Sequence, residues 1–236
     1  RRRPRGRGAA QGHETNQGPP RSPPRSFSIT VVQPGQANGT TLGPTKTTYN
    51  DDIIMGWVGI GSQIDGLGHI GVDNVYYNCN KAQDFAQAGG LTKLGIEKVP
   101  PFATKGILLD MAGYYNTDIV KEGTAFNRPE IEAAMKRQGV ASIERGDVVL
   151  FHTGWTKLIG KDNKRYGSVE PGLGVGGAKY LAERGVAAVG ADTWAREVLP
   201  PETGEGGFGV HLRLIPRHGP SIQETTETAE SDKDRD

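Results

Sequence analysis

The chain has 236 residues, a formal net charge of +1 and one cysteine, Cys79. At about 100–200 residues per domain, this length predicts a single domain. One cysteine excludes a disulfide framework and a CxxC zinc ribbon. No apolar run approaches the roughly 20 residues of a membrane-spanning helix, so no membrane partner is expected. A reducing, cytoplasmic setting fits this composition.

The small net charge hides an uneven distribution. Residues 1–26 contain seven arginines and one acid, Glu14, so the rest of the chain is net acidic. This stretch is rich in Arg, Pro, Gly and Ser and has almost nothing to bury, which predicts a disordered arm. Nucleic-acid binding is the alternative, but a charge run alone supports it poorly and we do not expect it. Residues 225–236 predict a flexible acidic tail, and residues 27–224 a single folded domain.

Between these ends, strand and helix patterns alternate. We predict strands over 27–32, 55–64, 106–111, 147–155, 186–193 and 210–216, and helices over 81–96, 128–138 and 177–185, with a glycine-rich turn at 66–71. Pro129 stands at the start of the second helix, and Gly185 ends the third. Alternating strands and helices indicate the α/β class.

Gly172, Gly174 and Gly177 have the spacing of a dinucleotide-binding fingerprint before a helix. A true fingerprint follows a strand directly, whereas a polar segment closed by Pro171 stands here. Asp192 comes too early to serve as the acid that binds ribose. An NAD(P)-linked oxidoreductase therefore rests on three glycines alone.

Two other clusters carry metal-binding side chains. Asp65, His69 and Asp73 follow a predicted strand at four-residue intervals, and glycines between them would let the side chains converge. Carboxylates and an imidazole suit zinc or manganese, although a surface loop with chance acids has the same spacing. His211 and Glu224 lie thirteen residues apart and could meet across a cleft.

Two further histidines, His152 and His218, lie at or after the ends of predicted strands. His152 ends a buried strand, where α/β ligand sites open, but it could equally be a structural core histidine. His218 follows the strand predicted over 210–216.

Five segments together resemble the cyclase family of metal-dependent hydrolases, which includes bacterial-type kynurenine formamidases and isatin hydrolases. They are YNDDIIMGWVGIGSQIDGLGHIGVDNVYYN, GILLDMAGYYN, IERGDVVLFHTGW, YLAERGVAAVGADTWAREVLPP and VHLRLIPRHG, in the family's order. The resemblance implies a swivelling β/β/α fold, a homodimer, and hydrolysis of an amide, lactam or related acyl bond with bound zinc or manganese.

The family signature is His-x-Gly-Thr-His-x-Asp-x-Pro-x-His. His69 matches its second histidine, and Asp65 stands in place of the first. Gly71 replaces the aspartate and Val75 the last histidine, whereas Asp73 is displaced by two residues.

Later in the chain, His211 and Glu224 resemble the family's later metal-side histidine and carboxylate. The resemblance thus implies a metal site drawn from Asp65, His69, Asp73 and His211. The candidate catalytic bases are His211, Glu224 and His152.

We therefore predict a metal-dependent, arylformamidase-like hydrolase of a small and optionally aromatic substrate. Trp57, Trp155 and Trp194 are candidates to line an aromatic pocket. The alternative is a protein with a degenerate metal site that keeps the fold for binding or structure without turnover, because Gly71 and Val75 depart from the signature.

Overall fold

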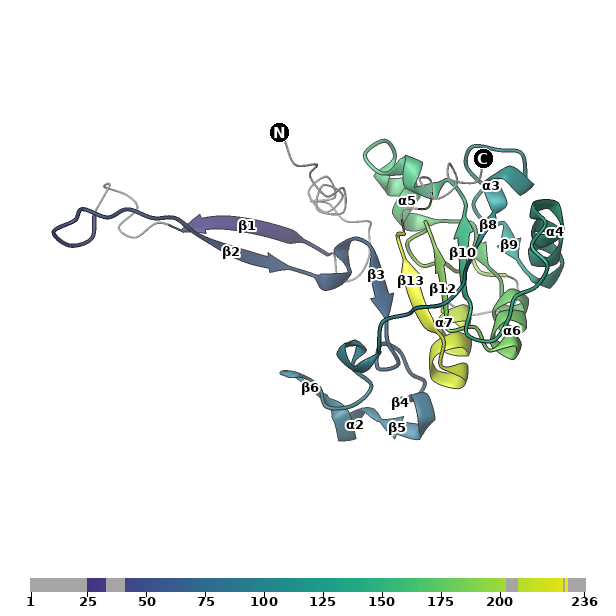
Figure 1. The fold of residues 1–236 in the computed structure, drawn as a ribbon, viewed down its shortest axis with the longest axis horizontal. Helices are drawn as coiled ribbons and strands as arrows, with labels where there is room; N and C mark the ends of the chain where they lie inside the picture. The colour runs from purple at the N-terminus through teal and green to yellow at the C-terminus, as the bar shows by residue number, and fades with distance from the viewer. Residues whose placement is uncertain (1–24, 33–40, 203–207, 227, 229–236) are drawn as a thin grey trace.

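A five-stranded sheet lies at the centre of this computed structural model, which describes residues 25–32, 41–202, 208–226 and 228. From one edge to the other, its strands are β3 (Gln63–Asp65), β13 (Ser221–Glu224), β12 (Ala188–Ala191), β10 (Val148–His152) and β8 (Gly106–Asp110) (Figure 1). The last four strands run parallel, and β3 is antiparallel to β13. The α/β class predicted from the sequence is confirmed.

Helices connect the parallel strands and cover one face of the sheet. They are α4 (Arg128–Gln138) between β8 and β10, α6 (Val175–Arg184) between β10 and β12, and α7 (Gly209–Arg213) with a π-helical turn (Leu214–His218) between β12 and β13. The side chains of Ile107, Val149, Val189 and Ile222 lie in register across the sheet and join one buried cluster with the helices. Parallel strands linked by crossover helices bury the main core in this way.

The helix α4 has the predicted bounds, and α6 begins two residues before and ends one residue before its predicted bounds. Asn127 and Glu130 form a capping box at the start of α4, and Gly139 ends this helix in the left-handed conformation. Gly185 ends α6 in the same way, with a φ of 70°. The strands predicted over 27–32, 106–111, 147–155 and 186–193 are present with slightly different ends.

Three predicted elements were wrong. The strand over 55–64 is divided: β2 ends at Gly56, a 3₁₀ turn follows (Val58–Ile60), and β3 begins at Gln63. The helix over 81–96 is present only as α2 (Ala82–Phe85), because Gly90 at a φ of 133° turns the chain. The strand over 210–216 is helical, since its buried residues Val210, Leu214 and Ile215 follow helical spacing. The strand β13 was not predicted.

The remaining elements are short and lie around the sheet. They are the 3₁₀ turns Tyr77–Cys79, Ile96–Lys98 and Trp155–Leu158, the helices α3 (Met111–Tyr114) and α5 (Asn163–Ser168), and the paired strands β4 (Val75–Tyr76) with β5 (Asn80–Lys81), β6 (Ala86–Gln87) with β7 (Gly90–Leu91), and β9 (Ala125–Phe126) with β11 (Gly172–Leu173). None of the helices in the described part of the chain is long and apolar enough to cross a membrane.

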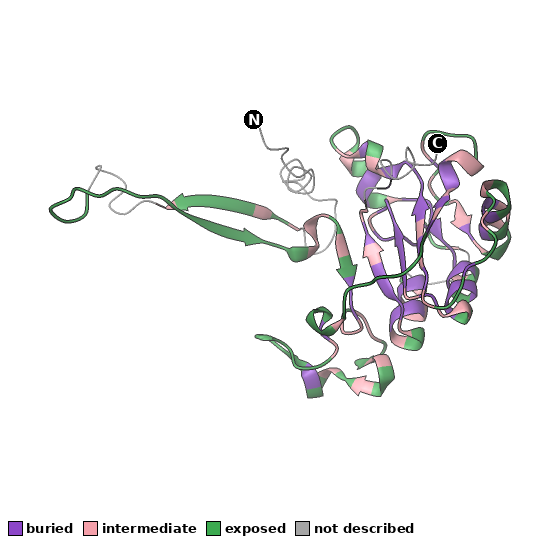
Figure 2. Cartoon of the chain, viewed as in Figure 1, coloured by how far each residue is buried: buried purple, intermediate pink, exposed green. Residues whose placement is uncertain are grey.

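A two-stranded hairpin projects from the body of the molecule. It pairs β1 (Phe27–Val32) antiparallel with β2 (Asp51–Gly56), and Figure 2 shows that nearly all of it is exposed, in contrast to the purple core of the sheet. Residues 1–24 of the arm predicted over 1–26, and most of the acidic tail, fall outside the described residues. Arg25 is described, and its Nη1 donates to Gln63 Oε1 at 3.0 Å.

The fingerprint-like glycines have a packing explanation. A Cβ atom at Gly177 would clash with the carbonyl oxygen of Phe126, where α6 crosses β9. Gly174 precedes α6 and also faces a neighbouring side chain, that of Asn127. These glycines therefore let a helix approach a strand closely, which accounts for their spacing without a nucleotide.

We expect Gly177→Ala to destabilise the protein by about 1–3 kcal/mol, because the added methyl group meets backbone that cannot move aside. Gly106→Ala is the matched control, since the space at Gly106 is open and its φ is ordinary. Urea unfolding of both variants measures the difference. Equal stability of Gly177→Ala and the parent protein would contradict the packing explanation.

Candidate metal centre

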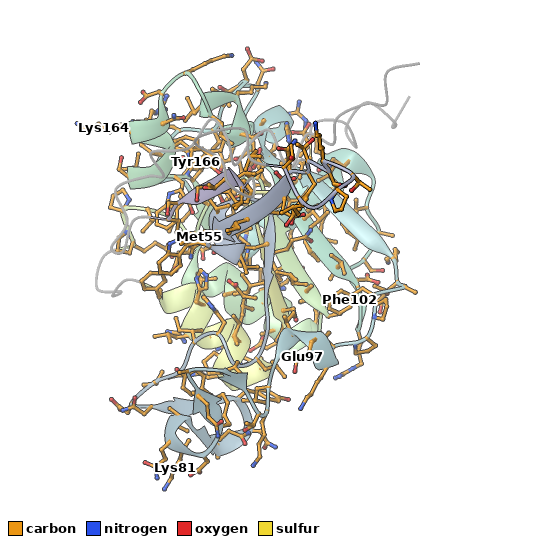
Figure 3. The ribbon with its side chains drawn as sticks, turned by 90° about the vertical axis from the view of Figure 1, so that its left-hand side faces the viewer. Met55, Lys81, Glu97, Phe102, Lys164 and Tyr166 are labelled. Atoms are coloured by element: carbon orange, nitrogen blue, oxygen red, sulfur yellow. The ribbon has the colours of Figure 1, made fainter. Side chains whose placement is uncertain are left out.

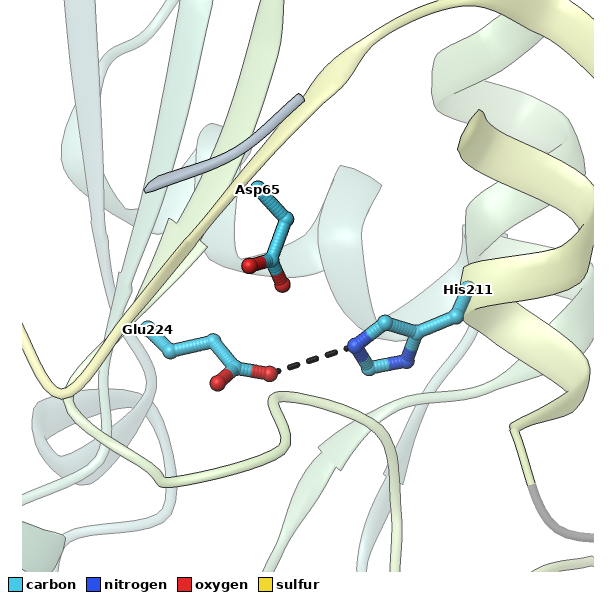
Figure 4. A group of neighbouring side chains, drawn as sticks. All are labelled: Asp65, His211 and Glu224. Atoms are coloured by element: carbon cyan, nitrogen blue, oxygen red, sulfur yellow. Dashed lines mark hydrogen bonds and ion pairs between the residues drawn. The ribbon is translucent and has the colours of Figure 1, made fainter. Parts of the chain in front are cut away.

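Three buried side chains from distant parts of the chain converge beside the sheet. Asp65 ends β3, His211 lies in α7 and Glu224 ends β13 (Figure 4). One ligand atom from each lies within 4.8 Å of the others. All three residues are at most 6% exposed. An imidazole nitrogen and two carboxylates gathered out of water form a donor set for a divalent cation.

The register of β3 on β13 places both carboxylates on one face. Gln63 pairs with Glu224 and Asp65 pairs with Ile222, so the alternating side chains of both strands point to the same side. This is the side that α7 covers, and the first turn of α7 buries His211 beside Val210. The site thus depends on a strand pair and on one short helix.

Hydrogen bonds orient each member of the group. His211 contacts Glu197 Oε1 through Nδ1 at 2.8 Å and Glu224 Oε1 through Nε2 at 3.2 Å. Gln63 Nε2 donates to Glu224 Oε2 at 2.6 Å and to Asp65 Oδ1 at 3.2 Å. A carboxylate on the far nitrogen of a histidine is the usual outer partner of a metal-binding imidazole.

Burial and charge shift the pKa values of the group. Burial raises the pKa of Asp65, the negative charge of Glu224 raises it further, and the positive charge of nearby basic groups opposes this. Burial disfavours protonation of His211, but its hydrogen bonds to Glu197 and Glu224, with their charges, raise its pKa to about 9. The repulsion between the two carboxylates and the attraction of nearby basic groups thus act on Asp65 in opposite directions.

One oxygen of the group lacks a hydrogen-bond donor. Asp65 Oδ2 is buried and accepts no hydrogen bond from any of the described residues. A buried carboxylate oxygen without a donor is costly, and a coordinated cation would satisfy it. The nitrogen and oxygen donors present therefore fit a divalent metal ion.

Two residues of the first predicted cluster lie near the surface. His69 Nε2 lies 3.6 Å from Asp65 Oδ2, and the histidine side chain is 42% exposed. It therefore borders the group from the solvent side. Asp73 is exposed, in a turn with a φ of 50°, and the group of Asp65, His211 and Glu224 does not include it.

The two other histidines lie apart from this group. His152 is buried, and its Nδ1 contacts Thr228 Oγ1 at 2.7 Å and Asp192 Oδ2 at 3.7 Å. His218 is exposed at the end of the π-helical turn. The structure therefore joins Asp65, His211 and Glu224, places His69 at their rim, and gives His152 a separate network.

Three residues around the centre were not predicted as site residues from the sequence: Gln63, Glu197 and Arg196. Glu197 and Arg196 lie in a segment that the resemblance covered, but nothing in their spacing links them to His211. Only the fold shows this, because Glu197 lies in an irregular segment after β12.

The three tryptophans do not form a common pocket. Trp155 is fully buried in a small cluster with Leu158 and Tyr166, and Trp194 packs against that cluster. Trp57 is 46% exposed near the base of the hairpin.

Comparisons with known proteins agree with this fold. The Cyclase family model, described as "Putative cyclase", matches residues 20–198. A solved structure described as a novel cyclase has a TM-score of 0.76 and 25% identity, over 93% of this chain and 73% of the other. Isatin hydrolase A from Ralstonia solanacearum has a TM-score of 0.60 and 16% identity, over 88% of this chain and 71% of its own.

A third solved structure, isatin hydrolase A from Labrenzia aggregata bound to benzyl benzoate, has a TM-score of 0.55 and 16% identity over 85% of this chain and 70% of its own. No curated protein matches the sequence significantly. The family match covers well over half of the chain and stops short of His211 and Glu224, which the fold brings to the centre. The chain belongs to the cyclase family, whose members include metal-dependent hydrolases.

Proposed function

We propose that this protein is a metal-dependent hydrolase that cleaves the amide, lactam or related acyl bond of a small substrate. The observation that carries this proposal is the buried group of Asp65, His211 and Glu224, with its unpartnered oxygen on Asp65. The membership of this chain in the cyclase family supports the same reaction class, hydrolysis. The lactam substrate named for two structural neighbours, isatin, supports the choice of a small aromatic amide as substrate.

We propose zinc or manganese as the cofactor, held by Asp65, His211 and Glu224. His69 completes the ligand set from its exposed position beside Asp65. When bound, such an ion would polarise a carbonyl group and lower the pKa of its bound water to about 7. Glu197 fixes the His211 ring so that Nε2 faces the carboxylates, and Gln63 fixes both carboxylates.

A base must accept the proton that the attacking water loses. Glu224 and His211, which belong to the centre, are the first candidates, and either can act as the base only through an atom that does not bind the ion. The role of His152 as a base remains a prediction from the sequence. Its side chain contacts Thr228 and Asp192, in a network apart from the centre. The cytoplasmic location also stays a prediction.

A direct test combines metal analysis with a hydrolysis screen. Purified protein should retain zinc or manganese, and with either ion added it should hydrolyse one compound among isatin, N-formyl aromatic amines, lactams and lactones. Bound metal without any turnover would favour the alternative of a binding or structural protein. Protein that binds neither ion would contradict the proposal.

Glu224→Gln should lower metal affinity and turnover while the protein stays folded, because the amide keeps the size of the side chain and removes its charge. Loss of a general base costs about 10²–10⁴-fold in rate, and loss of a ligand should be partly rescued by added metal. Glu183→Gln, which changes an exposed carboxylate on α6, is the matched control. Unchanged metal content and kinetics in Glu224→Gln would remove this residue from the site.

Metal affinity should rise with pH up to about pH 9. Protonated His211 cannot bind a cation, and its pKa in the metal-free protein is about 9. Below that pH, each unit of acidification should weaken the apparent metal affinity about tenfold, because one proton must be released on binding. Isothermal titration with Zn²⁺ between pH 6 and pH 9 measures this slope. A flat profile would show that His211 is not a ligand.

We also propose that the protein forms a homodimer through its projecting hairpin. An isolated two-stranded hairpin is only marginally stable in water, so a partner surface is expected to cover it. Both faces of the hairpin expose apolar side chains: Ile29, Val31 and Ile54 on one face are 49%, 55% and 67% exposed, and Ile53 and Met55 on the other are 50% and 68% exposed. A second copy of the chain fits this surface, because a two-fold axis would cover both hairpins at once.

Met55→Asp should shift the protein from dimer to monomer, because it places a charge in the covered apolar surface. Phe102→Asp is the control: Phe102 is an exposed apolar residue, and Figure 3 shows it in a different part of the molecule from Met55. Sedimentation velocity measures both variants. A monomeric parent protein would contradict the proposed dimer.

A further inference from the structure

Arg196 is a fully buried arginine whose hydrogen bonds are incomplete. Its Nε donates to the carbonyl oxygen of Gln223 at 3.3 Å, next to Glu224. Its Nη1 and Nη2 atoms are buried, and none of the described residues accepts a hydrogen bond from them. A guanidinium carries five N–H donors and stays charged, so four buried donors without an acceptor are a large cost.

Four carboxylates compensate the charge of Arg196 without bonding its free amino groups. Burial lowers the pKa of Arg196 to about 10, and the charges of Glu224, Asp65, Glu197 and Glu170 oppose this shift. These acids are engaged elsewhere: Glu224 and Glu197 with His211, and Glu170 with the backbone N–H groups that follow β12. Their oxygens therefore balance the charge and leave the fork of amino groups free.

The backbone holds Arg196 in this position. Its φ of 57° lies in the left-handed region, which is unfavourable for a long side chain and persists only when the surroundings impose it. Its carbonyl oxygen accepts a hydrogen bond from Leu173 N at 2.8 Å. Strain of this kind is found at sites that bind ligands, which agrees with the free donors.

Other unpaired polar atoms lie close by along the chain. Thr193 Oγ1 and Thr226 Oγ1 are buried and have no partner among the described residues. The two segments are joined, since Thr225 N donates to Thr193 O at 2.9 Å. Both segments follow the carboxyl ends of the parallel strands β12 and β13, which is where α/β sheets bind ligands.

We infer that Arg196 binds the carboxylate group formed by hydrolysis and so selects substrates whose acyl group it can hold beside the metal centre. This rests on the proposed function. With an amide or lactam, water adds its oxygen to the carbonyl carbon and the C–N bond breaks. One of the two protons of water goes to the leaving nitrogen and the other to a base, so the acyl product is a carboxylate. The planar fork of a guanidinium matches the two oxygens of that group.

The test is titration of the protein with benzoate, followed by calorimetry, with and without added Zn²⁺. Loss of a bidentate charged pair should weaken benzoate binding by about 10- to 100-fold in Arg196→Gln. Arg196→Lys should lie between this variant and the parent, because it keeps the charge and loses the fork. Arg128→Gln, which removes an exposed guanidinium at the start of α4, should bind like the parent.

Equal benzoate affinity in the parent and in Arg196→Gln would overturn the inference, as would a parent protein that binds no benzoate. If Arg196→Gln does not fold, Arg196→Lys and the parent titration still decide. Metal content should be unchanged in Arg196→Lys. Loss of metal in Glu224→Gln tests the proposed function separately. The titration of the metal-free parent with benzoate tests Arg196, because no metal ion takes part in it.

Discussion

The antiparallel pairing of β3 with β13 is the constraint on which the candidate centre depends. It adds an edge strand from the first third of the chain to a parallel sheet and brings Asp65 beside Glu224. A slip of one residue in this register would turn Asp65 and Gln63 to the opposite face, away from α7. The core around Ile222 fixes the register, since Ile222 is fully buried and pairs directly with Asp65. Hydrophobic packing therefore determines where the charged groups meet.

Burying several charges together is tolerable only because each is bonded in a defined way. Removing a carboxylate from water is expensive, and a like charge nearby adds to the cost. His211 lies between Glu197 and Glu224, Gln63 bridges Glu224 and Asp65, and the charge of Arg196 acts on the same carboxylates. Among these charged groups, the two amino groups of Arg196 and Asp65 Oδ2 find no hydrogen-bond partner in the described residues. An anion and a cation, respectively, are the chemical groups that complete them.

The sequence predicted the class of fold and the helices with clear boundary signals, because caps and glycines act locally. Asn127, Gly139 and Gly185 define helix ends whatever surrounds them. It failed at 210–216, where alternating Val210, Leu212 and Leu214 resemble a strand, although burial at Val210, Leu214 and Ile215 shows a helix. Asp65, His211 and Glu224 were each singled out from the sequence, but their meeting could not be derived, because it depends on β13, which was not predicted. Arg196 and Glu197 carry no spacing signal at all.

The departures from the family signature have a steric cause in the turn that follows His69. Val72 and Val75 exchange two backbone hydrogen bonds, which closes a tight turn. A Cβ atom at Gly71 would lie 2.6 Å from the carbonyl oxygen of Val75 and 2.9 Å from the ring of Tyr76. The aspartate that the signature has at this position therefore cannot be accommodated without opening the turn. The buried group instead combines Asp65 with His211 and Glu224, which Glu197 and Gln63 hold in place. The turn therefore explains why no acidic side chain stands at position 71, and why Asp65 is the residue of this segment that joins the C-terminal pair.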